Sequence, residues 1–403
     1  MAPTRPRPLR IAFLSSNRTP WGGSEELWSA AAAELAAAGH AVTVFKARID
    51  PRVPRIQRLR ELGVRMHDLV WLRWVPRKLT SVLVHYADPF MVAQQVVRLW
   101  AGLRRFRPDL VVLSQGGNQD GHLMGEICRR MKLPYAVIVQ KATDMYWPED
   151  RRLPRLRAMY SEAAASLFVS EHNRRLTEEQ LGIPVPRASV VRNPVLVPWT
   201  ERSDWPDEQD GLHLACIGRL YPPEKGQDLL IRVLARDKWR DRRLSLSFYG
   251  DGPQRQGLER MAAFHGLTNI SFRGFTADVA SIWNEHHALL LGSRCEGLPL
   301  VVVEAMLSGR VPIVTAVAGA EVIEDGVHGF LAHAPTEDAI DDALERAWQR
   351  RADWRTLGAA ASSHIRTLVP ADPPAALAEM LARLAGGVHE ELAMEEMLAG
   401  SPR

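Results

Sequence analysis

The feature that most limits the fold of this chain is a repeated alternation of short apolar runs with helix-like segments. Near the start, Leu9–Ser15, Glu25–Ala38 and Ala41–Ala47 follow one another as an apolar run, a helix-patterned segment and a second apolar run. Alternation of this kind is typical of a parallel sheet covered by helices. Further strands are predicted at Leu110–Ser114, Tyr135–Gln140 and Ser166–Ser170. The first 195 residues therefore predict one doubly wound α/β domain.

A second series of the same kind begins after Pro194–Gly211, a segment rich in proline and acidic residues without helical or strand periodicity. Its strands are rich in Val, Ile and Leu, which is typical of strands buried on both faces. We predict strands at Leu212–Ile217, Leu244–Tyr249, Ile270–Arg273, Ala288–Leu291 and Val311–Thr315, and helices at Gln227–Leu234, Gln254–His265, Leu300–Leu307 and Ala339–Gln349. The expected organisation is a domain at 1–195, a linker at 196–211, a second domain at 212–370, and a helical segment with a tail at 371–403.

The charge of the chain is divided unevenly between its halves. Residues 1–200 carry 30 basic and 17 acidic side chains, whereas the remainder carries 21 and 30. A basic first domain suits an anionic acceptor, a phosphorylated lipid or a membrane face, and it equally suits attraction to an acidic second domain. The basic residues are not joined to a nucleic-acid-binding module, so nucleic acid is not an expected partner.

Cysteine usage and apolar run lengths indicate a cytoplasmic protein. The three cysteines, Cys128, Cys216 and Cys295, fit neither a disulfide framework nor a zinc cluster. The run Ile11–Leu14 is too short for a signal-peptide core, and no run approaches the roughly 18 to 20 residues of a membrane span.

Peripheral contact with the inner face of a membrane is a further hypothesis, which rests on the Trp- and Arg-rich segment Val70–Leu79 (VWLRWVPRKL). Tryptophan prefers the membrane interface, and cations bind lipid phosphates. The competing interpretation is a basic segment partly packed in the core, because Pro76 interrupts any long amphipathic helix.

Two loops carry features suited to a diphosphate. In Thr19–Ser24 (TPWGGS), Gly22 and Gly23 precede a predicted helix, whose free N–H groups attract anions, although such a pair also forms ordinary tight turns. In the second domain, Arg219 and Lys225 flank a loop after the first strand (CIGRLYPPEKG). Two cations there would stabilise a departing diphosphate, and the alternative is a solvated loop in which Glu224 forms a surface pair.

Two carboxylates lie eight positions apart in Ser293–Met306 (SRCEGLPLVVVEAM). Glu296 falls in a Gly/Pro loop after a strand, and Glu304 lies one turn inside the next helix. A carboxylate is a two-point acceptor for vicinal hydroxyls, as a ribose or hexose presents them. The alternative makes Glu296 a helix cap and Glu304 an exposed residue, yet Glu304 is surrounded by apolar neighbours in the sequence.

Together these motifs resemble a known family. GGSEE, GRLYPPEKG, YGDGP and EGLPLVVVEAM, in this order, resemble the retaining GT-B glycosyltransferases of family 4 over most of residues 9–370. The resemblance implies two Rossmann-like domains that face each other across a cleft, a nucleotide-diphospho-sugar donor and no cofactor.

The resemblance also implies roles for individual residues. In the family the first glutamate of the Glu-x7-Glu motif lies near the donor sugar and the second binds ribose, which gives these roles to Glu296 and Glu304. The family's diphosphate-binding cations match Arg219 and Lys225, with the two prolines setting them one residue further apart than usual. The remaining donor-binding positions are glycine-loop and backbone positions: Gly22, Gly23, Gly250, Gly297 and Leu298.

One position departs from the family pattern. Many members carry a histidine at the end of a first-domain strand, where this chain has Gln140. Candidates for acceptor-side polar groups near it in the sequence are Asp120, His122, Lys141 and Asp144.

The implied reaction transfers a hexose with retention of configuration. UDP-hexose is the favoured donor and GDP-mannose the next, and the acceptor is a glycan, a lipid-linked glycan or a small molecule. The sequence has no Asp-x-Asp motif, so no metal site is expected. The alternatives are a GT-B epimerase, a sugar-phosphate synthase, or a non-catalytic binding protein of the same fold.

Overall fold

The computed structural model describes residues 7–70, 93–200 and 203–387, which form two compact units. The first contains the described residues of Met1–Val169, Asn173–Asn193 and Asp372–Met394. The second contains Ser170–His172 and the described residues of Pro194–Ala371. The segment predicted as a linker, as far as it is described, therefore groups with the second unit.

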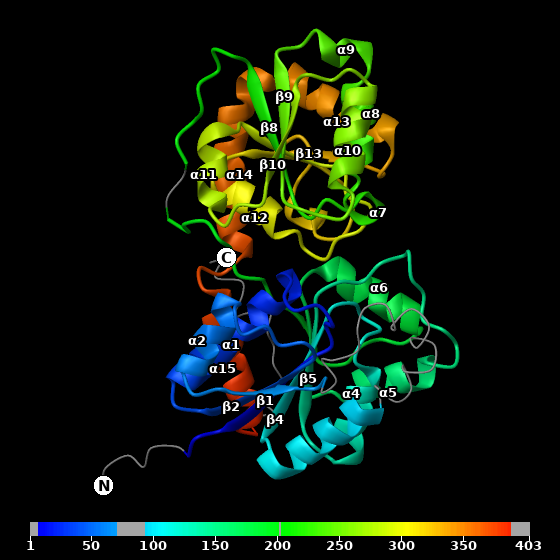
Figure 1. Cartoon of the computed structure of the whole chain (residues 1–403), viewed down its shortest axis with the longest axis vertical. Coiled ribbons are helices and arrows are strands. Elements are labelled where there is room, and N and C mark those ends of the chain that lie inside the picture. The colour runs from blue at the N-terminus through cyan, green and yellow to red at the C-terminus, as the bar shows by residue number, and fades with distance from the viewer. Residues whose placement is uncertain (1–6, 71–92, 201–202, 388–403) are drawn as a thin grey trace, which may run out of the picture. The chain divides into compact units, whose positions relative to one another are not determined.

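The first unit is built on a parallel sheet of seven strands in the order β3-β2-β1-β4-β5-β6-β7. Its strands β2, β1, β4 and β5 are labelled in Figure 1. Successive side chains of β1 enter different cores: Ile11 and Phe13 join one, and Ala12 and Leu14 join the other. The strand is thus buried on both faces, as its apolar run predicted. The strands are β1 (Arg10–Ser15), β2 (Ala41–Lys46), β3 (Arg65–Asp68), β4 (Leu110–Gln115), β5 (Tyr135–Val139), β6 (Ala165–Phe168) and β7 (Ala188–Val190).

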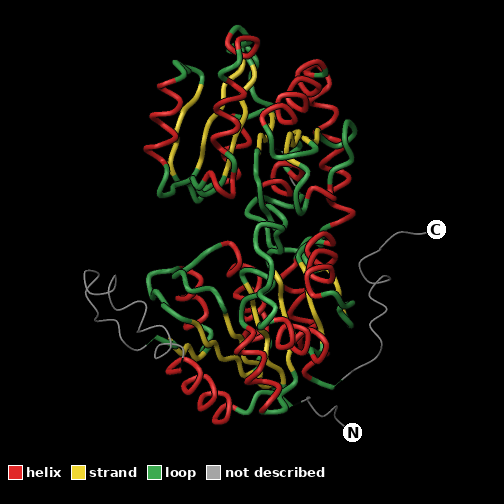
Figure 2. The backbone as a smooth tube through the Cα atoms, turned by 90° about the vertical axis from the view of Figure 1, so that its right-hand side faces the viewer, coloured by secondary structure: helices red, strands yellow, loops and turns green. Residues whose placement is uncertain are grey.

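Helices cover both faces of this sheet, as the tube view shows (Figure 2). One core contains residues of α1 (Glu26–Ala37), which follows the short 3-10 turn Gly23–Glu25, of α2 (Pro54–Glu61) and of α15 (Pro373–Ala385). The other contains residues of the helix at 93–106, α4 (His122–Arg130), α5 (Leu153–Glu162) and α6 (Glu171–Leu181).

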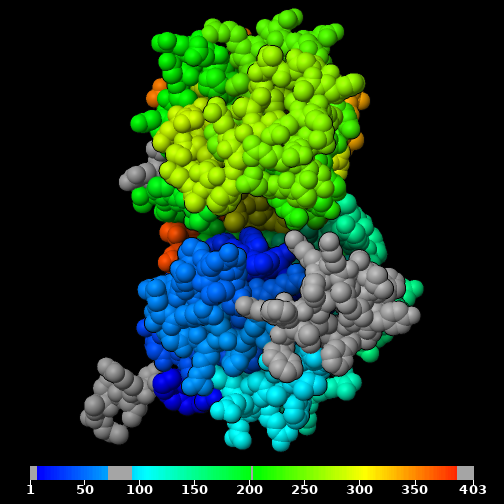
Figure 3. All heavy atoms as spheres, in the orientation of Figure 1, coloured from blue at the N-terminus to red at the C-terminus, as the bar shows by residue number. Residues whose placement is uncertain are grey.

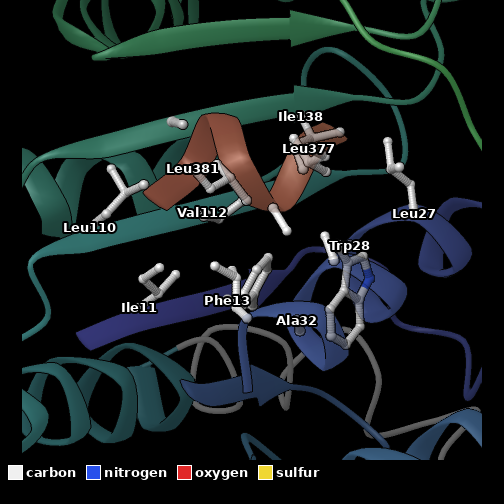
Figure 4. Close-up of a cluster of buried hydrophobic side chains, with 14 of the residues drawn as sticks. Ile11, Phe13, Leu27, Trp28, Ala32, Leu110, Val112, Ile138, Leu377 and Leu381 are labelled. Carbon is white, nitrogen blue, oxygen red and sulfur yellow. The ribbon is translucent and has the colours of Figure 1, made fainter. Parts of the chain in front are cut away.

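Helix α15 joins the first unit although it follows the whole second unit in the sequence. Its Leu377 and Leu381 are buried beside Phe13, Trp28 and Ile138 (Figure 4). Asp372 caps its N-terminus by accepting a hydrogen bond from the Ala375 N–H at 2.9 Å. The sequence predicted a helical segment here but not the partner on which it packs.

The second unit contains a parallel sheet of six strands in the order β10-β9-β8-β11-β12-β13. Its strands are β8 (Leu212–Ile217), β9 (Leu244–Tyr249), β10 (Ile270–Gly274), β11 (Ala288–Leu291), β12 (Val311–Thr315) and β13 (Phe330–Ala332). Its helices are α7 (Pro222–Lys225), α8 (Gln227–Leu234), α9 (Asp237–Arg240), α10 (Arg255–Phe264), α11 (Val279–Glu285), α12 (Leu300–Leu307), α13 (Glu337–Gln349) and α14 (Trp354–Leu368). The two Rossmann-like α/β units expected from the sequence are confirmed.

In both sheets the strand order reverses beside the first strand of the unit. The neighbours β1 and β4 flank this point in the first sheet, and β8 and β11 flank it in the second. Helices that leave on opposite faces open a crevice at the carboxyl ends of such neighbours, and ligands of open α/β sheets bind there. The loops after these four strands are therefore the places to look for functional side chains.

Basic side chains of the first half lie on exposed helical surface. Arg58 and Arg60 on α2 are exposed, as are Arg98, Arg104 and Arg105 on the helix at 93–106. The blue segment that includes α2 lies on the surface in the space-filling view (Figure 3). Across the described ranges, no helix is both long enough and apolar enough to cross a membrane.

Candidate functional site

In the second unit, the loops after β8 and β11 meet through a charged pair. Lys225 Nζ donates to both carboxylate oxygens of Glu296, at 2.6 and 2.7 Å. Ser293 Oγ donates to Glu296 Oε1 at 2.7 Å. The Glu296 side chain is 8% exposed and that of Lys225 27% exposed. A cation and a carboxylate predicted from separate motifs thus lie side by side at the point where the strand order reverses.

The local fold explains why these two side chains meet. The two prolines of the loop begin a single helical turn, α7, which ends at Lys225. Gly226 then adopts φ +61°, and a side chain on it would lie 1.8 Å from the Gly292 carbonyl oxygen, so only glycine fits. The Glu224 carbonyl accepts the N–H groups of Arg294 and Cys295, at 2.7 and 3.2 Å. These contacts fix the loop after β11 against α7.

Lys225 forms its ion pair with Glu296, so it is not a free cation of a solvated loop. Arg219 is exposed and lies with its guanidinium carbon 5.0 Å from the centre of the Tyr221 ring. Its planar guanidinium has five N–H donors, which suit bidentate binding of phosphate. The loop thus presents one exposed cation and one that is anchored by a carboxylate.

Glu304 lies on α12, which starts after the loop that carries Glu296. It is 3% exposed, so the alternative of an exposed helix residue is wrong. Its Oε1 accepts the Leu196 N–H at 3.0 Å. Burial raises the pKa of Glu304 to about 7, while the Leu196 N–H acts in the opposite direction. The alternative for Glu296 is also wrong, since Pro299 occupies the N-cap of α12.

The backbone positions predicted to bind the donor lie in tight loops. Gly250 follows β9 with φ +123°, and a side chain on it would lie 2.2 Å from the Gly218 carbonyl oxygen. Gly297 and Leu298 are buried between Glu296 and the start of α12. Gly250 is thus required for close approach of the loops after β8 and β9.

In the first unit, the glycine pair lies in the loop after β1, beside the reversal point of its sheet. Gly22 has an extended backbone, and Gly23 begins the 3-10 turn that leads into α1. No atom lies within 4 Å of the position that a side chain on Gly23 would take. Gly23 therefore leaves open space at the start of a helix, as the diphosphate hypothesis requires, whereas a side chain on Gly22 would lie 3.4 Å from Asn17 Nδ2.

A buried ion pair that the sequence did not predict supports this loop. Glu25 and Lys46 are both 1% exposed or less, and Lys46 Nζ lies 3.2 Å from Glu25 Oε2. Lys46 also donates to the carbonyl oxygens of Asn17 and Thr19, at 2.8 and 2.9 Å, and Ser15 Oγ donates to Glu25 at 2.9 Å. Burial raises the pKa of Glu25 and lowers that of Lys46, and their mutual attraction opposes both shifts.

One feature of the sequence could have indicated this buried ion pair. Lys46 ends the apolar run of β2, and a lysine in a buried strand needs an acidic partner. The sequence places Glu25 at the start of the predicted helix Glu25–Ala38 and does not indicate whether its side chain is buried. In the structure the side chain lies in the interior.

The acceptor-side candidates lie on the loops after β4 and β5. Asp120 and Asp144 are exposed, and burial lowers the pKa of His122, the first residue of α4. Gln140 is 7% exposed and accepts a hydrogen bond from Asn193 Nδ2 at 2.9 Å. Its Nε2 has no hydrogen-bond partner among the described residues. The two loops are joined by Gln119 Nε2, which donates to the Tyr146 carbonyl at 2.6 Å.

Family models match both units. Residues 22–194 match the glycosyl transferase 4-like domain, and residues 211–350 match the glycosyl transferases group 1. The chain belongs to the group 1 glycosyltransferases of family 4. The two matched ranges include Gly22 and Gly23 in the first unit, and Arg219, Lys225 and the whole Glu-x7-Glu segment in the second.

Other members of this family and fold are similar to the chain over different lengths. A GDP-mannose-dependent alpha-(1-6)-phosphatidylinositol monomannoside mannosyltransferase of Mycolicibacterium smegmatis is 29% identical over 55% of this chain and 63% of its own length. A glycogen synthase of Pseudomonas syringae is 29% identical over 36% of this chain and 30% of its own. These matches span less than two thirds of each relative.

Solved GT-B structures share the fold of this family 4 member. Anabaena HepE in complex with UDP and glucose aligns with a TM-score of 0.71 at 17% identity, over 93% of this chain and 99% of its own. The sucrose-phosphate synthase of Thermosynechococcus elongatus gives 0.70 at 17% identity, over 94% and 100%.

Within the ranges that the structure describes, no three His, Cys, Asp or Glu side chains gather as a metal site would need. The Trp- and Arg-rich segment Val70–Leu79 lies, apart from Val70, outside the described residues. Membrane contact through this segment stays a prediction.

Proposed function

We propose that this protein transfers a hexose from a nucleotide-diphospho-sugar to a glycan, lipid-linked or small-molecule acceptor, with retention of configuration. The observation that carries the proposal is the pair of Lys225 and Glu296 at the reversal point of the second sheet. Family membership supplies the reaction class.

In the proposed reaction, bond cleavage at the sugar places negative charge on the departing diphosphate. Arg219, Lys225 and the backbone N–H groups of Gly22 and Gly23 stabilise that charge, and Glu296 positions the sugar. Glu304 accepts hydrogen bonds from the ribose hydroxyls. The acceptor oxygen attacks the same face that the diphosphate leaves, and the departing phosphate oxygen accepts the acceptor's proton. This route needs no protein nucleophile.

The two donors expected from the sequence gain support from different proteins. The mycobacterial relative is named as GDP-mannose-dependent, whereas Anabaena HepE was solved with UDP. The sequence relative is 29% identical and the structural neighbour 17%. GDP-mannose is therefore the first donor to test, and UDP-glucose the second. We also propose that no metal is required, since the sequence lacks an Asp-x-Asp motif.

The test is a thermal-shift titration of the whole chain with UDP, GDP, ADP, dTDP and their sugar conjugates, each with and without EDTA. We expect one nucleotide family to raise the melting temperature in both conditions. Glu304→Ala should lose this shift, whereas Lys225→Ala should keep most of it and lose turnover. Absence of any nucleotide response would favour a non-catalytic binding protein.

Product analysis separates the remaining alternatives. Incubation with donor alone detects an epimerase, and addition of a phosphosugar detects a sugar-phosphate synthase. Proton NMR of the product of an α-linked donor should show an α-glycoside, and a β-glycoside would contradict retention.

A further inference from the structure

The loop after β5 exposes three consecutive large apolar side chains. Met145, Tyr146 and Trp147 are 47%, 60% and 61% exposed, whereas Ala142 and Pro148 on either side of them are buried. Burying such side chains stabilises a fold by about 1.5 to 3 kcal/mol each, and here that stabilisation is not used. Large apolar side chains that are exposed at neighbouring positions are candidates for contact with another molecule.

The backbone of this loop is held in place. Gln119 Nε2 donates to the Tyr146 carbonyl at 2.6 Å, and Gln180 Nε2 donates to the Thr143 carbonyl at 2.8 Å. Gln180 is itself fixed, because its Oε1 accepts a hydrogen bond from Asn118 Nδ2 at 2.8 Å. The side chains of Gln180 and Asn118, which form this hydrogen bond, are 4% and 6% exposed. The aromatic rings therefore project from an ordered support, which lowers the entropy lost when a ligand binds.

The position of the loop points to a ligand of the first unit. It leaves the carboxyl end of β5, next to the loop that leaves β4, and carboxyl ends of parallel strands are where ligands of such sheets bind. Two exposed carboxylates, Asp120 and Asp144, lie on these loops. Carboxylates accept hydrogen bonds from hydroxyl groups.

The charged residues that flank Tyr146 and Trp147 in the sequence distinguish between an anionic lipid surface and a sugar as the ligand. Asp144, Glu149 and Asp150 flank the exposed segment, Lys141 lies at the start of the same loop, and Arg151 and Arg152 are paired with Glu149. An anionic lipid surface attracts clusters of free cations and is repelled by acids. A sugar ring instead offers hydroxyls to the carboxylates and a C–H face to the electron-rich face of an aromatic ring.

We propose that Tyr146 and Trp147 form a stacking platform for a sugar ring of the acceptor, and that Asp120 and Asp144 accept hydrogen bonds from its hydroxyls. This inference rests on the proposed function and names the acceptor class as a glycan. Trp147 and Tyr146 are then specificity-determining residues for the acceptor.

The experiment measures glycan binding directly. The labelled whole chain, with GDP or UDP present, is applied to an array of mannosides, glucosides, galactosides and N-acetylhexosaminides. We expect binding to at least one class, weakened about two- to tenfold by Tyr146→Ala or Trp147→Ala. Trp147→Phe should retain most of it. Phe264→Ala is the matched control, because Phe264 is 85% exposed on the second unit and should have no effect.

Three outcomes would refute the proposal that Tyr146 and Trp147 bind a sugar ring. The wild-type chain could bind no glycan on the array, or Trp147→Ala could bind as the wild type does. The variants could also lose binding to phosphatidylglycerol vesicles and not to glycans, which would assign the loop to a lipid surface. The thermal shift with nucleotide separates these failures from failure of the proposed function: if it persists, only the platform is refuted, and if the wild type lacks it, the function itself is refuted.

Discussion

Replacement of Glu304 by glutamine should stabilise the ligand-free protein at neutral pH. Glu304 is 3% exposed, and burial raises its pKa from the ordinary 4.5 to about 7. Glutamine has nearly the same shape and keeps an oxygen that can accept the Leu196 N–H. The variant therefore removes the titration of this group while preserving its main contact.

The sign and size of this stabilisation follow from the difference in proton binding between the folded and the unfolded chain. Below pH 4.5 the carboxyl group is protonated in both the folded and the unfolded chain, and it adds no pH dependence. Between pH 4.5 and about 7 the folded chain binds more protons, so stability falls by about 1.4 kcal/mol per pH unit. By pH 8 the wild type has lost about 3 kcal/mol that Glu304→Gln retains.

Urea unfolding of both proteins at pH 5, 6, 7 and 8 measures this effect. The difference in unfolding free energy between the two cancels the titration of all other groups. It should grow from pH 5 to pH 7 and then level off. A difference that stays constant with pH would refute the reasoning, since it would mean that Glu304 titrates near its ordinary value.

Three further substitutions test the Lys225–Glu296 pair, the buried Glu25–Lys46 pair and the close contact at Gly226. Lys225→Ala should lower turnover on the order of 10² to 10³-fold, because it removes one cation from the leaving diphosphate. Lys46→Met should destabilise the protein by about 3 to 5 kcal/mol in urea unfolding, because it removes the cation that pairs with the buried Glu25 carboxylate. Gly226→Ala should abolish nucleotide binding in the thermal-shift assay, because the new methyl group would overlap the Gly292 carbonyl.

Each of these three substitutions has a control variant of the same protein. Turnover of Lys238→Ala, on a surface lysine of the same unit, should be that of the wild type, and an equal loss would contradict a specific role of Lys225. The double variant Glu25→Gln/Lys46→Met should recover part of the stability lost in Lys46→Met, and additive losses would argue against coupling. Gly266→Ala also introduces a side chain at positive φ, +65°, but meets no atom closer than 4.0 Å, so it should keep nucleotide binding.

Apolar patterning predicted the central strands well. The predicted bounds of β8, β9, β11 and β12 match the structure, because strands buried on both faces have continuous apolar runs. The polar strand β3, with sequence RMHD, has no such run and was not predicted. Short edge strands such as β7 and β13 gave too few residues for a pattern.

The sequence predicted which residues form the candidate site, but it did not predict which residues they contact. The spacing of Glu296 and Glu304 identified both, yet their partners are distant in the sequence: Lys225 is 71 positions from Glu296, and Leu196 is 108 from Glu304. Local sequence does not specify such contacts. Likewise, the sequence left open whether Glu25 is exposed, because its partner Lys46 lies on the next strand.

The return of α15 to the first unit sets the order in which the chain can fold during synthesis. The sheet of that unit is complete once Asn193 has been made, but α15 follows only after residues 194–371. At typical rates of translation this interval lasts roughly ten to forty seconds. During it, the apolar face that contains Phe13 and Ile138 has no α15 to cover it. A gene cut before Asp372 would leave that face permanently uncovered, so the first unit should be expressed with α15 supplied on the same chain or as a separate segment.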